Sequence, residues 1–349
     1  MLTILSKIFQ FFVNKRNNWY AQHINNTAVV LRSEYPVISV GNLSVGGTGK
    51  TPTVLELCKI LKELGHSPCI IGRGYKRKNK CDVVVSDGKN IFVDAKIGGD
   101  EMVLLAENAK VPVIAGNSKS KIAMSIKNFA KENNLQIDCL IIDDGFQHRK
   151  LYRDLDIVLI DSATLENPFL LPKGRLREPL TSLNRADIIL LTKDAKKEQL
   201  IQKYEYLVKR KLVLEVKTDL AEYYLLCPEN KNNNLQNTNK IITATGIANP
   251  QNFINMLKNK NYDVINSEIY ADHHNFRISD IKQLCAKCKQ YNCSNIAITE
   301  KDAVKFKEFQ NLFDANKINI LVFKLNIFIE NQEKLVNLLI EKIENFKYK

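Results

Sequence analysis

The residues whose types and order suggest chemistry most directly are eight in a row: Ser44, Val45, Gly46, Gly47, Thr48, Gly49, Lys50 and Thr51. Glycines let backbone N–H groups curl around an anion without a Cβ clash. A lysine at the position of Lys50 reaches the β- and γ-phosphates of a nucleotide, and the hydroxyl of Thr51 is suited to bind Mg²⁺. These residues predict a phosphate-binding loop with one departure, because Ser44 stands where the usual pattern has a glycine.

A pair of carboxylates follows later in the chain. Asp143 and Asp144 come at the end of an apolar stretch, residues 137–142. Adjacent carboxylates repel each other unless a cation or solvent relieves them. The end of a strand is also where a nucleotide-binding enzyme places the carboxylate that holds Mg²⁺. We therefore expect Asp143 and Asp144 to organise Mg²⁺ with Thr51; a solvated turn is the alternative, and the sequence does not decide which carboxylate is the direct ligand.

Two further places carry groups that could transfer or orient a proton. Asp100 follows two glycines at the expected start of a helix, where it could cap the helix or act as a base or metal-shell carboxylate. Two of the five histidines meet in Asp272-His273-His274. Such a pair could orient a base or bind phosphate or metal, and it could equally belong to a surface loop. The residues alone leave these alternatives open.

The elements around the glycine-rich segment are those that a phosphate-binding loop requires. Residues 36–40 form a short apolar, β-branched stretch typical of a buried strand. Residues 51–61 have apolar side chains at helical spacing, and Pro52 suits a first helical turn. Strands alternate with helices along the chain, which predicts an α/β fold with a mostly parallel sheet and helices on both faces. A glycine-rich turn with a chance Gly-Lys-Thr is the alternative.

The length of 349 residues is sufficient for two domains. We expect a nucleotide-binding domain over residues 1–216 and a smaller α/β domain over 217–349, joined through a strand linker near 212–227. Residues 229–240 are dominated by asparagine and lysine and predict a loop.

The chain carries 51 Lys and Arg against 38 Asp and Glu, a net charge of +13 that favours anionic partners. Its eight cysteines show no paired framework, which indicates a reducing, cytoplasmic compartment. Residues 1–13 are mostly apolar, with Lys15 and Arg16 following. They predict either an interfacial helix on a membrane surface or a terminal helix docked on the protein's own core. No apolar run approaches the ~18 residues of a membrane span.

Several segments together resemble one family, the tetraacyldisaccharide 4'-kinases, also called lipid A 4'-kinases. They occur in the same order across most of the chain, and the serine at position 44 belongs to that family's pattern. Met102 departs from it, since the family often has proline there. The similar segments are 41–52, 72–75, 99–101, 143–148, 171–179, 246–250, 272–274 and 299–303.

The resemblance implies an ATP-dependent lipid kinase. It would transfer the γ-phosphate of ATP, with Mg²⁺, to the 4'-hydroxyl of an acylated glucosamine disaccharide 1-phosphate in lipid A biosynthesis. Its place would be peripheral, on the cytoplasmic face of the bacterial inner membrane. No nucleic acid is implied, and no protein partner can be inferred.

The resemblance also implies roles for single residues. Asp100 would be the general base for the acceptor hydroxyl, and His273 would orient it, with His274 as the other candidate for that pairing. The candidate substrate-binding residues are Arg73, Arg177 and Glu178.

Two other functions are compatible with parts of the sequence. A P-loop kinase or NTPase acting on a soluble metabolite, or a GTPase switch, would share the glycine-rich loop, although no Asn-Lys-x-Asp guanine-binding motif is present. A basic nucleic-acid-binding protein would share the charge, but the sequence has no helix-turn-helix, RNA-binding or paired zinc motif.

Overall fold

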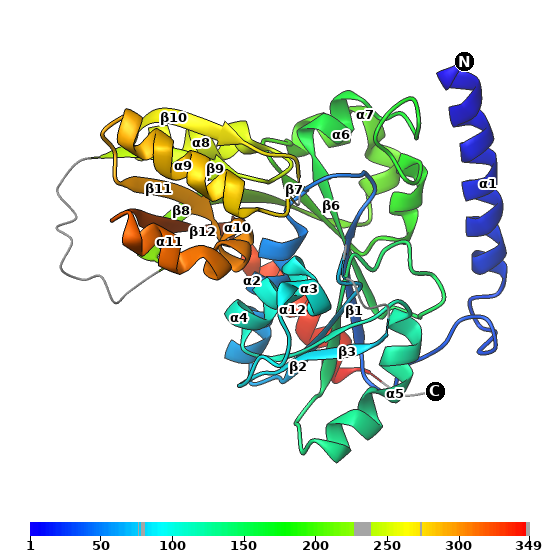
Figure 1. Cartoon of the computed structure of the whole chain (residues 1–349). Helices are drawn as coiled ribbons and strands as arrows, with labels where there is room; N and C mark the ends of the chain where they lie inside the picture. Colours follow the sequence, from blue (N-terminus) through cyan, green and yellow to red (C-terminus); the bar gives the residue numbers. More distant parts are fainter. Residues whose placement is uncertain (76, 78–80, 227–238, 273, 347–349) are drawn as a thin grey trace. The chain divides into compact units, whose positions relative to one another are not determined.

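The computed structural model describes residues 1–75, 77, 81–226, 239–272 and 274–346. The chain forms two compact units (Figure 1). Unit 1 contains Met1–Thr218 and Ile327–Lys349, and unit 2 contains Asp219–Asn326.

Unit 1 is an α/β unit whose strands are almost all parallel. Their order is β8-β7-β6-β1-β5-β2-β4-β3, and β3 alone among these pairs is antiparallel to its neighbour. The bounds are β1 (Val37–Asn42), β2 (Pro68–Gly72), β3 (Val83–Asp87), β4 (Pro112–Ala115), β5 (Cys139–Asp143), β6 (Leu155–Asp161), β7 (Ile188–Thr192) and β8 (Leu212–Leu225). The central strands are continuous apolar runs because both faces of a parallel sheet are covered.

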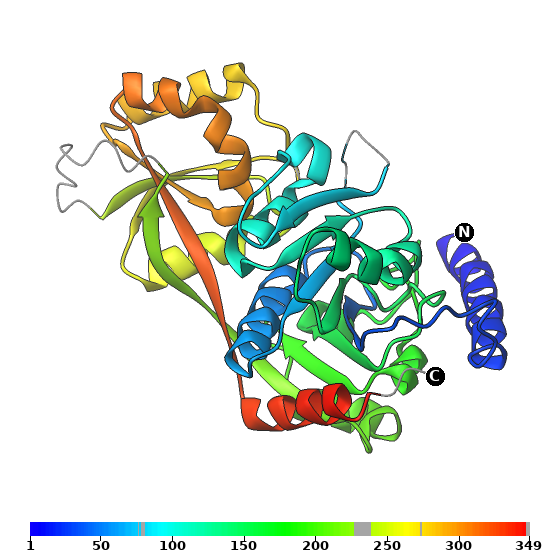
Figure 2. The same cartoon turned by 90° about the horizontal axis from the view of Figure 1, so that it is seen from below.

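Helices cover both faces of this sheet (Figure 2). Helices α2 and α12 lie on one face and α5 on the other, where Ile122 and Ile126 pack with Leu140 and Ile142 of β5. The bounds are α1 (Leu2–Gln22), α2 (Lys50–Glu63), α3 (Ala95–Gly98), α4 (Asp100–Ala109), α5 (Lys119–Glu132), α6 (Ser162–Glu166), η1 (Leu180–Arg185), α7 (Lys197–Val208) and α12 (Gln332–Glu344).

Unit 2 has a smaller sheet in the order β10-β9-β11-β12-β8. Strands β9, β10, β11 and β12 pair in parallel. The bounds are β9 (Lys240–Thr245), α8 (Pro250–Asn259), β10 (Asp263–Ile269), α9 (Ile278–Gln290), β11 (Asn295–Thr299), α10 (Glu300–Phe306), η3 (Lys307–Phe309), α11 (Gln310–Ala315) and β12 (Asn319–Ile329). Apolar side chains of α9, β9 and β11 form its main core.

The division of the chain differs from the predicted domains 1–216 and 217–349. The first boundary falls two residues later, and residues 327–349 belong to unit 1. The reason is the length of β8 and β12, which both run from one unit into the other. Past Asn326, the backbone N–H of Glu330 donates to the carbonyl of Glu215, 2.9 Å away, and α12 then follows within unit 1.

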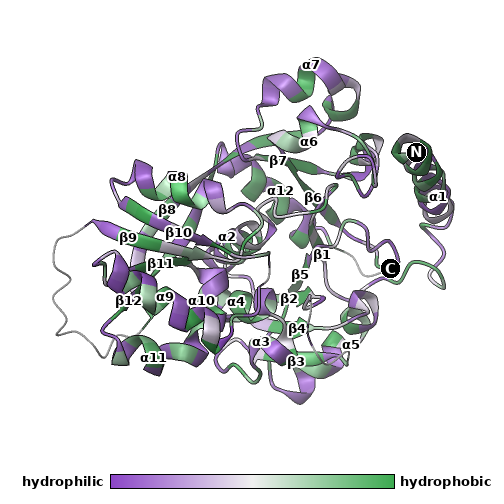
Figure 3. Cartoon of the chain, turned by 45° about the horizontal axis from the view of Figure 1, so that its top comes forward, coloured by the Kyte–Doolittle hydropathy of each residue, from purple (hydrophilic) through white to green (hydrophobic). Residues whose placement is uncertain are grey.

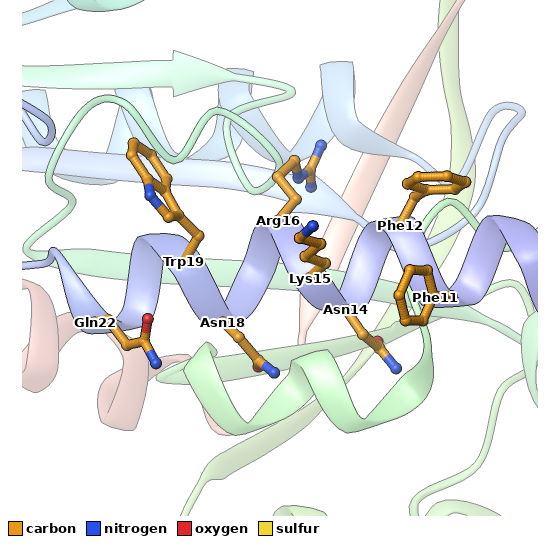
Figure 4. Close-up of a pocket in the computed structure, with 8 residues that line it drawn as sticks. All are labelled: Phe11, Phe12, Asn14, Lys15, Arg16, Asn18, Trp19 and Gln22. Atoms are coloured by element: carbon orange, nitrogen blue, oxygen red, sulfur yellow. The ribbon is translucent and has the colours of Figure 1, made fainter.

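Helix α1 is longer than the predicted segment of residues 1–13. Only Ser6, Val13 and Asn17 are buried along it, and most of its apolar side chains are exposed. Figure 3 shows that hydrophobic and hydrophilic residues both occur along α1. A hollow of about 770 Å³ runs along its second half, lined by α1 residues between Phe11 and Gln22 (Figure 4). Among the residues that the structure describes, no helix has both the length and the apolar character to cross a bilayer.

Candidate active site

The glycine-rich segment connects β1 to α2. Gly49 is the N-cap of α2 with φ 96°, in the left-handed region that favours glycine, and Lys50 and Thr51 begin the helix. Two hydrogen bonds fix Thr48 within the loop. Asn42 Nδ2 donates to Thr48 Oγ1 at 2.7 Å, and Thr192 Oγ1 donates to the Thr48 carbonyl at 2.9 Å. The N-terminus of α2 adds free N–H groups and the positive end of the helix dipole. The loop and the start of α2 together are therefore suited to bind an anion.

The strand-end carboxylates lie beside this loop. Strands β1 and β5 pair in register with Val40 opposite Asp143, so the carboxyl ends of both strands meet at one edge of the sheet. Lys50 Nζ lies 3.6 Å from Asp144 Oδ1 and 3.5 Å from Asn42 Oδ1. The structure therefore brings together the two groups of residues that the sequence predicts for nucleotide phosphates and Mg²⁺.

Asp144 is held in its ionised form. Both nitrogens of the Arg177 fork donate to it, Nη1 to Oδ2 at 3.0 Å and Nη2 to Oδ1 at 2.9 Å. Burial acts to raise the pKa of Asp144, but the hydrogen bonds from Arg177 and the charges of Lys50 and Lys119 outweigh it and lower the pKa below its usual range. Asp144 is thus an ionised carboxylate that is paired with Arg177.

Asp143 has the opposite environment. Its side chain is buried, and its Oδ1 has no hydrogen-bond partner among the described residues. Burial, followed by the charge of Glu101, raises the pKa of Asp143 to about 6. A buried oxygen without a donor is costly unless a cation reaches it. Asp143 is accordingly the side chain in this site that is best suited to gain from a bound metal ion.

Asp100 begins α4 close to the end of β2. Gly99, at φ 88°, approaches Gly74 so closely that a Cβ on Gly99 would lie 2.7 Å from the Gly74 Cα. A Cβ on Gly72 would lie 2.3 Å from Met102 Sδ and 3.6 Å from the Asp143 Cβ. The glycines therefore let the start of α4 and the ends of β2 and β5 pack side by side, and the charge of Glu101, next to Asp100 in the chain, acts on Asp143.

The three candidate substrate-binding residues have different surroundings. Arg73 is exposed in the loop after β2, and Arg177 reaches Asp144. Glu178 is fully buried, and its two oxygens accept hydrogen bonds from Arg16, Asn17 and Arg185. Glu178 is therefore occupied by the protein's own side chains.

The segment Asp272-His273-His274 follows strand β10 in the sequence. His273 is outside the described residues. His274 Nε2 lies 2.9 Å from Asp280 Oδ2, and its ring stacks on Tyr270 with centroids 4.9 Å apart. A hydrogen bond to Asp280 and an aromatic neighbour thus fix the ring of His274.

Two residues that the sequence analysis did not single out complete the site. Asn42 contacts the loop, Lys50 and Arg177 at once, and a buried amide at the end of an apolar strand is a signal that could have identified it. Lys119 is a buried ammonium that donates to the carbonyls of Asp143 and Asp144, at 2.6 and 2.8 Å. Burial lowers the pKa of Lys119. A lysine at the start of an ordinary amphipathic helix gives no such signal.

A family model described as tetraacyldisaccharide-1-P 4'-kinase matches residues 1–344. The chain belongs to this family. Curated relatives of this family include the tetraacyldisaccharide 4'-kinase of Syntrophus aciditrophicus, 34% identical over 89% of this chain and 85% of the relative. The enzyme of the same name from Chlorobium phaeobacteroides is 30% identical over 97% of this chain and 96% of its own.

A solved structure of the family has the same fold. It is described as the "apo" form of LpxK from Aquifex aeolicus in complex with ATP, and it is 29% identical, with a TM-score of 0.75 over 98% of both chains. The predictions of family, of an α/β fold and of a phosphotransferase of lipid A biosynthesis are confirmed. This family member is a kinase, and the site at the carboxyl ends of β1 and β5 is its candidate catalytic centre.

Proposed function

We propose that this kinase transfers the γ-phosphate of ATP to the 4'-hydroxyl of an acylated glucosamine disaccharide 1-phosphate. The observation that carries the proposal is the convergence of Lys50, Asp143 and Asp144 beside a glycine-rich helix N-terminus. Phosphoryl transfer requires positioning and charge stabilisation more than covalent chemistry by the protein, and these are the groups that supply both.

The nucleotide phosphates bind the N–H groups of the loop from Ser44 to Gly49 and the ammonium of Lys50. The described residues contain no cluster of three or more His, Cys, Asp or Glu that could hold a metal ion by itself. Mg²⁺ is usually held in proteins by one or two carboxylates plus phosphates. Thr51 and Asp143 would hold it together with the nucleotide phosphates and it would neutralise their charge, while Asp144, bound by Arg177, fixes the surrounding charges.

The acceptor hydroxyl needs a base, and Asp100 is that base in this proposal. Its place at a helix N-terminus favours the carboxylate form, while its burial favours the protonated form, so the two effects oppose each other. The family resemblance pairs Asp100 with His273, which lies outside the described residues. The alternative pairing with His274 is disfavoured, because His274 is already bound to Asp280 and stacked on Tyr270.

The acceptor is a lipid, and α1 carries the kinase to it. Its exposed side chains include Ile4, Ile8, Phe11 and Phe12, which form an apolar surface with lysines nearby. Such a helix lies in the plane of a membrane interface. In this proposal the surface is the cytoplasmic face of the inner membrane, and Arg73 and Arg177 attract the acidic groups of substrate and nucleotide.

Transfer of labelled γ-phosphate tests this proposal. The purified kinase is incubated with labelled ATP and Mg²⁺, with the acylated disaccharide 1-phosphate in detergent micelles in one arm and its water-soluble deacylated form in the other. We expect label in the acylated acceptor and much less in the deacylated one. Equal labelling of both would favour a P-loop kinase of soluble metabolites instead.

A further inference from the structure

We infer that Glu178 is a positioning residue that couples α1 to the nucleotide and metal site. The inference rests on the proposed function for the roles of Lys50, Asp143 and Asp144. It concerns a connection of side chains and backbone within unit 1, from the exposed helix α1 through the segment 170–178 to the glycine-rich loop.

The first part of the connection joins α1 to the segment 170–178. Arg16 Nη2 donates to Glu178 Oε1 at 2.9 Å, and Asn17 Nδ2 donates to Oε2 at 2.9 Å. Nearer the start of the helix, Ser6 Oγ donates to the Leu170 carbonyl at 3.0 Å. Glu178 is fully buried, so these charge-assisted bonds are stronger than they would be in water.

The second part joins the same segment to the glycine-rich loop. The backbone N–H of Val45 donates to the Arg175 carbonyl at 2.8 Å, and the N–H of Arg177 donates to the Leu43 carbonyl at 2.7 Å. Ser44 and Leu176 form an antiparallel bridge. The loop is therefore lined on one side by the backbone that α1 holds.

The third part is chemical. Arg177, adjacent to Glu178 in the chain, makes the two hydrogen bonds to Asp144. Arg185 donates to Glu178 Oε2 from the other side at 2.8 Å, so Arg185 and the two side chains of α1 hold Glu178 together. Fixing one residue restricts its neighbour, whose Cα is only about 3.8 Å away. Displacement of α1 would thus loosen Arg177 and, through it, Asp144.

Two neighbouring cations of α1 provide a matched test. Arg16→Ala removes a charge and the bond to Glu178, whereas Lys15→Ala removes a charge from the same helix turn without touching Glu178. Three quantities are measured on the full-length kinase: sedimentation with phosphatidylglycerol and phosphatidylethanolamine vesicles, the Mg²⁺ concentration for half-maximal transfer, and amide hydrogen exchange of residues 43–49 and 175–177.

We expect both variants to lose vesicle binding equally. Only Arg16→Ala should raise the Mg²⁺ requirement, by about fivefold or more, and only Arg16→Ala should speed exchange in the two segments. Equal exchange and equal Mg²⁺ requirements in the two variants would overturn the coupling. If the parent needs neither ATP nor Mg²⁺, the proposed function fails, and the exchange comparison still decides the coupling. Glu178→Gln, if it folds, should raise the Mg²⁺ requirement and speed amide exchange in the two segments more than Arg16→Ala does.

Discussion

The ammonium of Lys50 lies 3.6 Å from a carboxylate oxygen of Asp144, which joins the first residue of α2 to the residue that follows β5. This ion pair places the phosphate-binding cation and the metal-site carboxylates in one small volume. Charge that the fold positions where the phosphates react is the main source of catalysis in phosphoryl transfer.

Lys50 should be essential for transfer and dispensable for folding. Lys50→Ala removes the cation that neutralises the transferred phosphate, and we expect kcat to fall by about 10²–10³-fold or more. Thr51→Ala should have a comparable effect through Mg²⁺. Lys59→Ala, in the same helix and exposed, serves as the control. Turnover near the parent's in Lys50→Ala, at equal thermal stability, would mean that the nucleotide binds elsewhere.

The two adjacent carboxylates should respond differently to the same substitution. Asp143→Asn removes the oxygen that has no protein donor, so saturation with Mg²⁺ should be lost. Asp144→Asn releases Arg177 and should raise the Mg²⁺ concentration needed for half-maximal activity, but the activity should still saturate with Mg²⁺. Titration of activity with Mg²⁺ in both variants checks this. Identical titration curves in the parent and both variants would show that neither Asp143 nor Asp144 takes part in binding Mg²⁺.

Asp100 and His273 should act as one unit. Asp100→Asn should lower kcat by about 10²–10⁴-fold, the contribution of a positioned base, with ATP affinity nearly unchanged. His273→Ala should also lose activity, and the double variant should lose much less than the product of the single losses. If the double variant loses as much activity as the product of the two single losses, Asp100 and His273 act independently.

His274 provides the control for that pair. Because its ring is bound to Asp280 and stacked on Tyr270, His274→Ala should lower the thermal stability of the protein more than it lowers kcat. A loss of kcat larger than that of His273→Ala, at unchanged stability, would exchange the roles of the two histidines.

Much of this site could be predicted from the sequence because its signals are local. The strand, glycine turn and helix around Lys50 lie within one short stretch of sequence. Asp143 and Asp144 stand at the end of β5, the strand that pairs with β1. Lys119 could not be predicted, since its carbonyl partners depend on which helix packs beside β5. The return of residues 327–349 to unit 1 depends on the length of β12, which periodicity does not reveal.

The buried Asp302 of unit 2 should make stability depend on pH. It accepts hydrogen bonds from Thr299 Oγ1 at 2.9 Å and from the Gly246 N–H at 3.1 Å, but burial dominates and raises its pKa to about 6. Between about pH 4 and 6 the folded state keeps this proton while the unfolded state releases it, so stability falls across that range and then stays at the lower level.

Replacing this acid by its neutral isostere removes that cost. Relative to the parent, Asp302→Asn should therefore gain in free energy of unfolding as pH rises from about 4 to 7, by up to about 3 kcal/mol at 1.36 kcal/mol per pKa unit. Urea unfolding of both proteins across this range measures the difference, with the exposed Asp263→Asn as control. A difference that is constant with pH would contradict the raised pKa.

The apolar surface of α1 should determine lipid binding without affecting ATP. Ile8 and Phe12 are 49% and 62% exposed, whereas Phe9, an obvious choice from sequence alone, packs partly against the core of unit 1. Changing Ile8 and Phe12 to Glu should weaken vesicle binding and raise the KM for the lipid. The control changes Ile201 and Tyr206, exposed side chains of α7, to Glu, which adds the same charge at another place on the surface. Equal vesicle binding by both double variants would argue against α1 as the membrane contact.

The most direct test of the central claim is ³¹P NMR of the reaction product, recorded alongside consumption of ATP. The account predicts a new phosphate monoester coupled to the proton at the 4'-carbon of the acylated disaccharide, formed in equal amount to the ADP released and absent with Lys50→Ala. Release of ADP with free phosphate and no lipid product, or a monoester at another carbon, would contradict it.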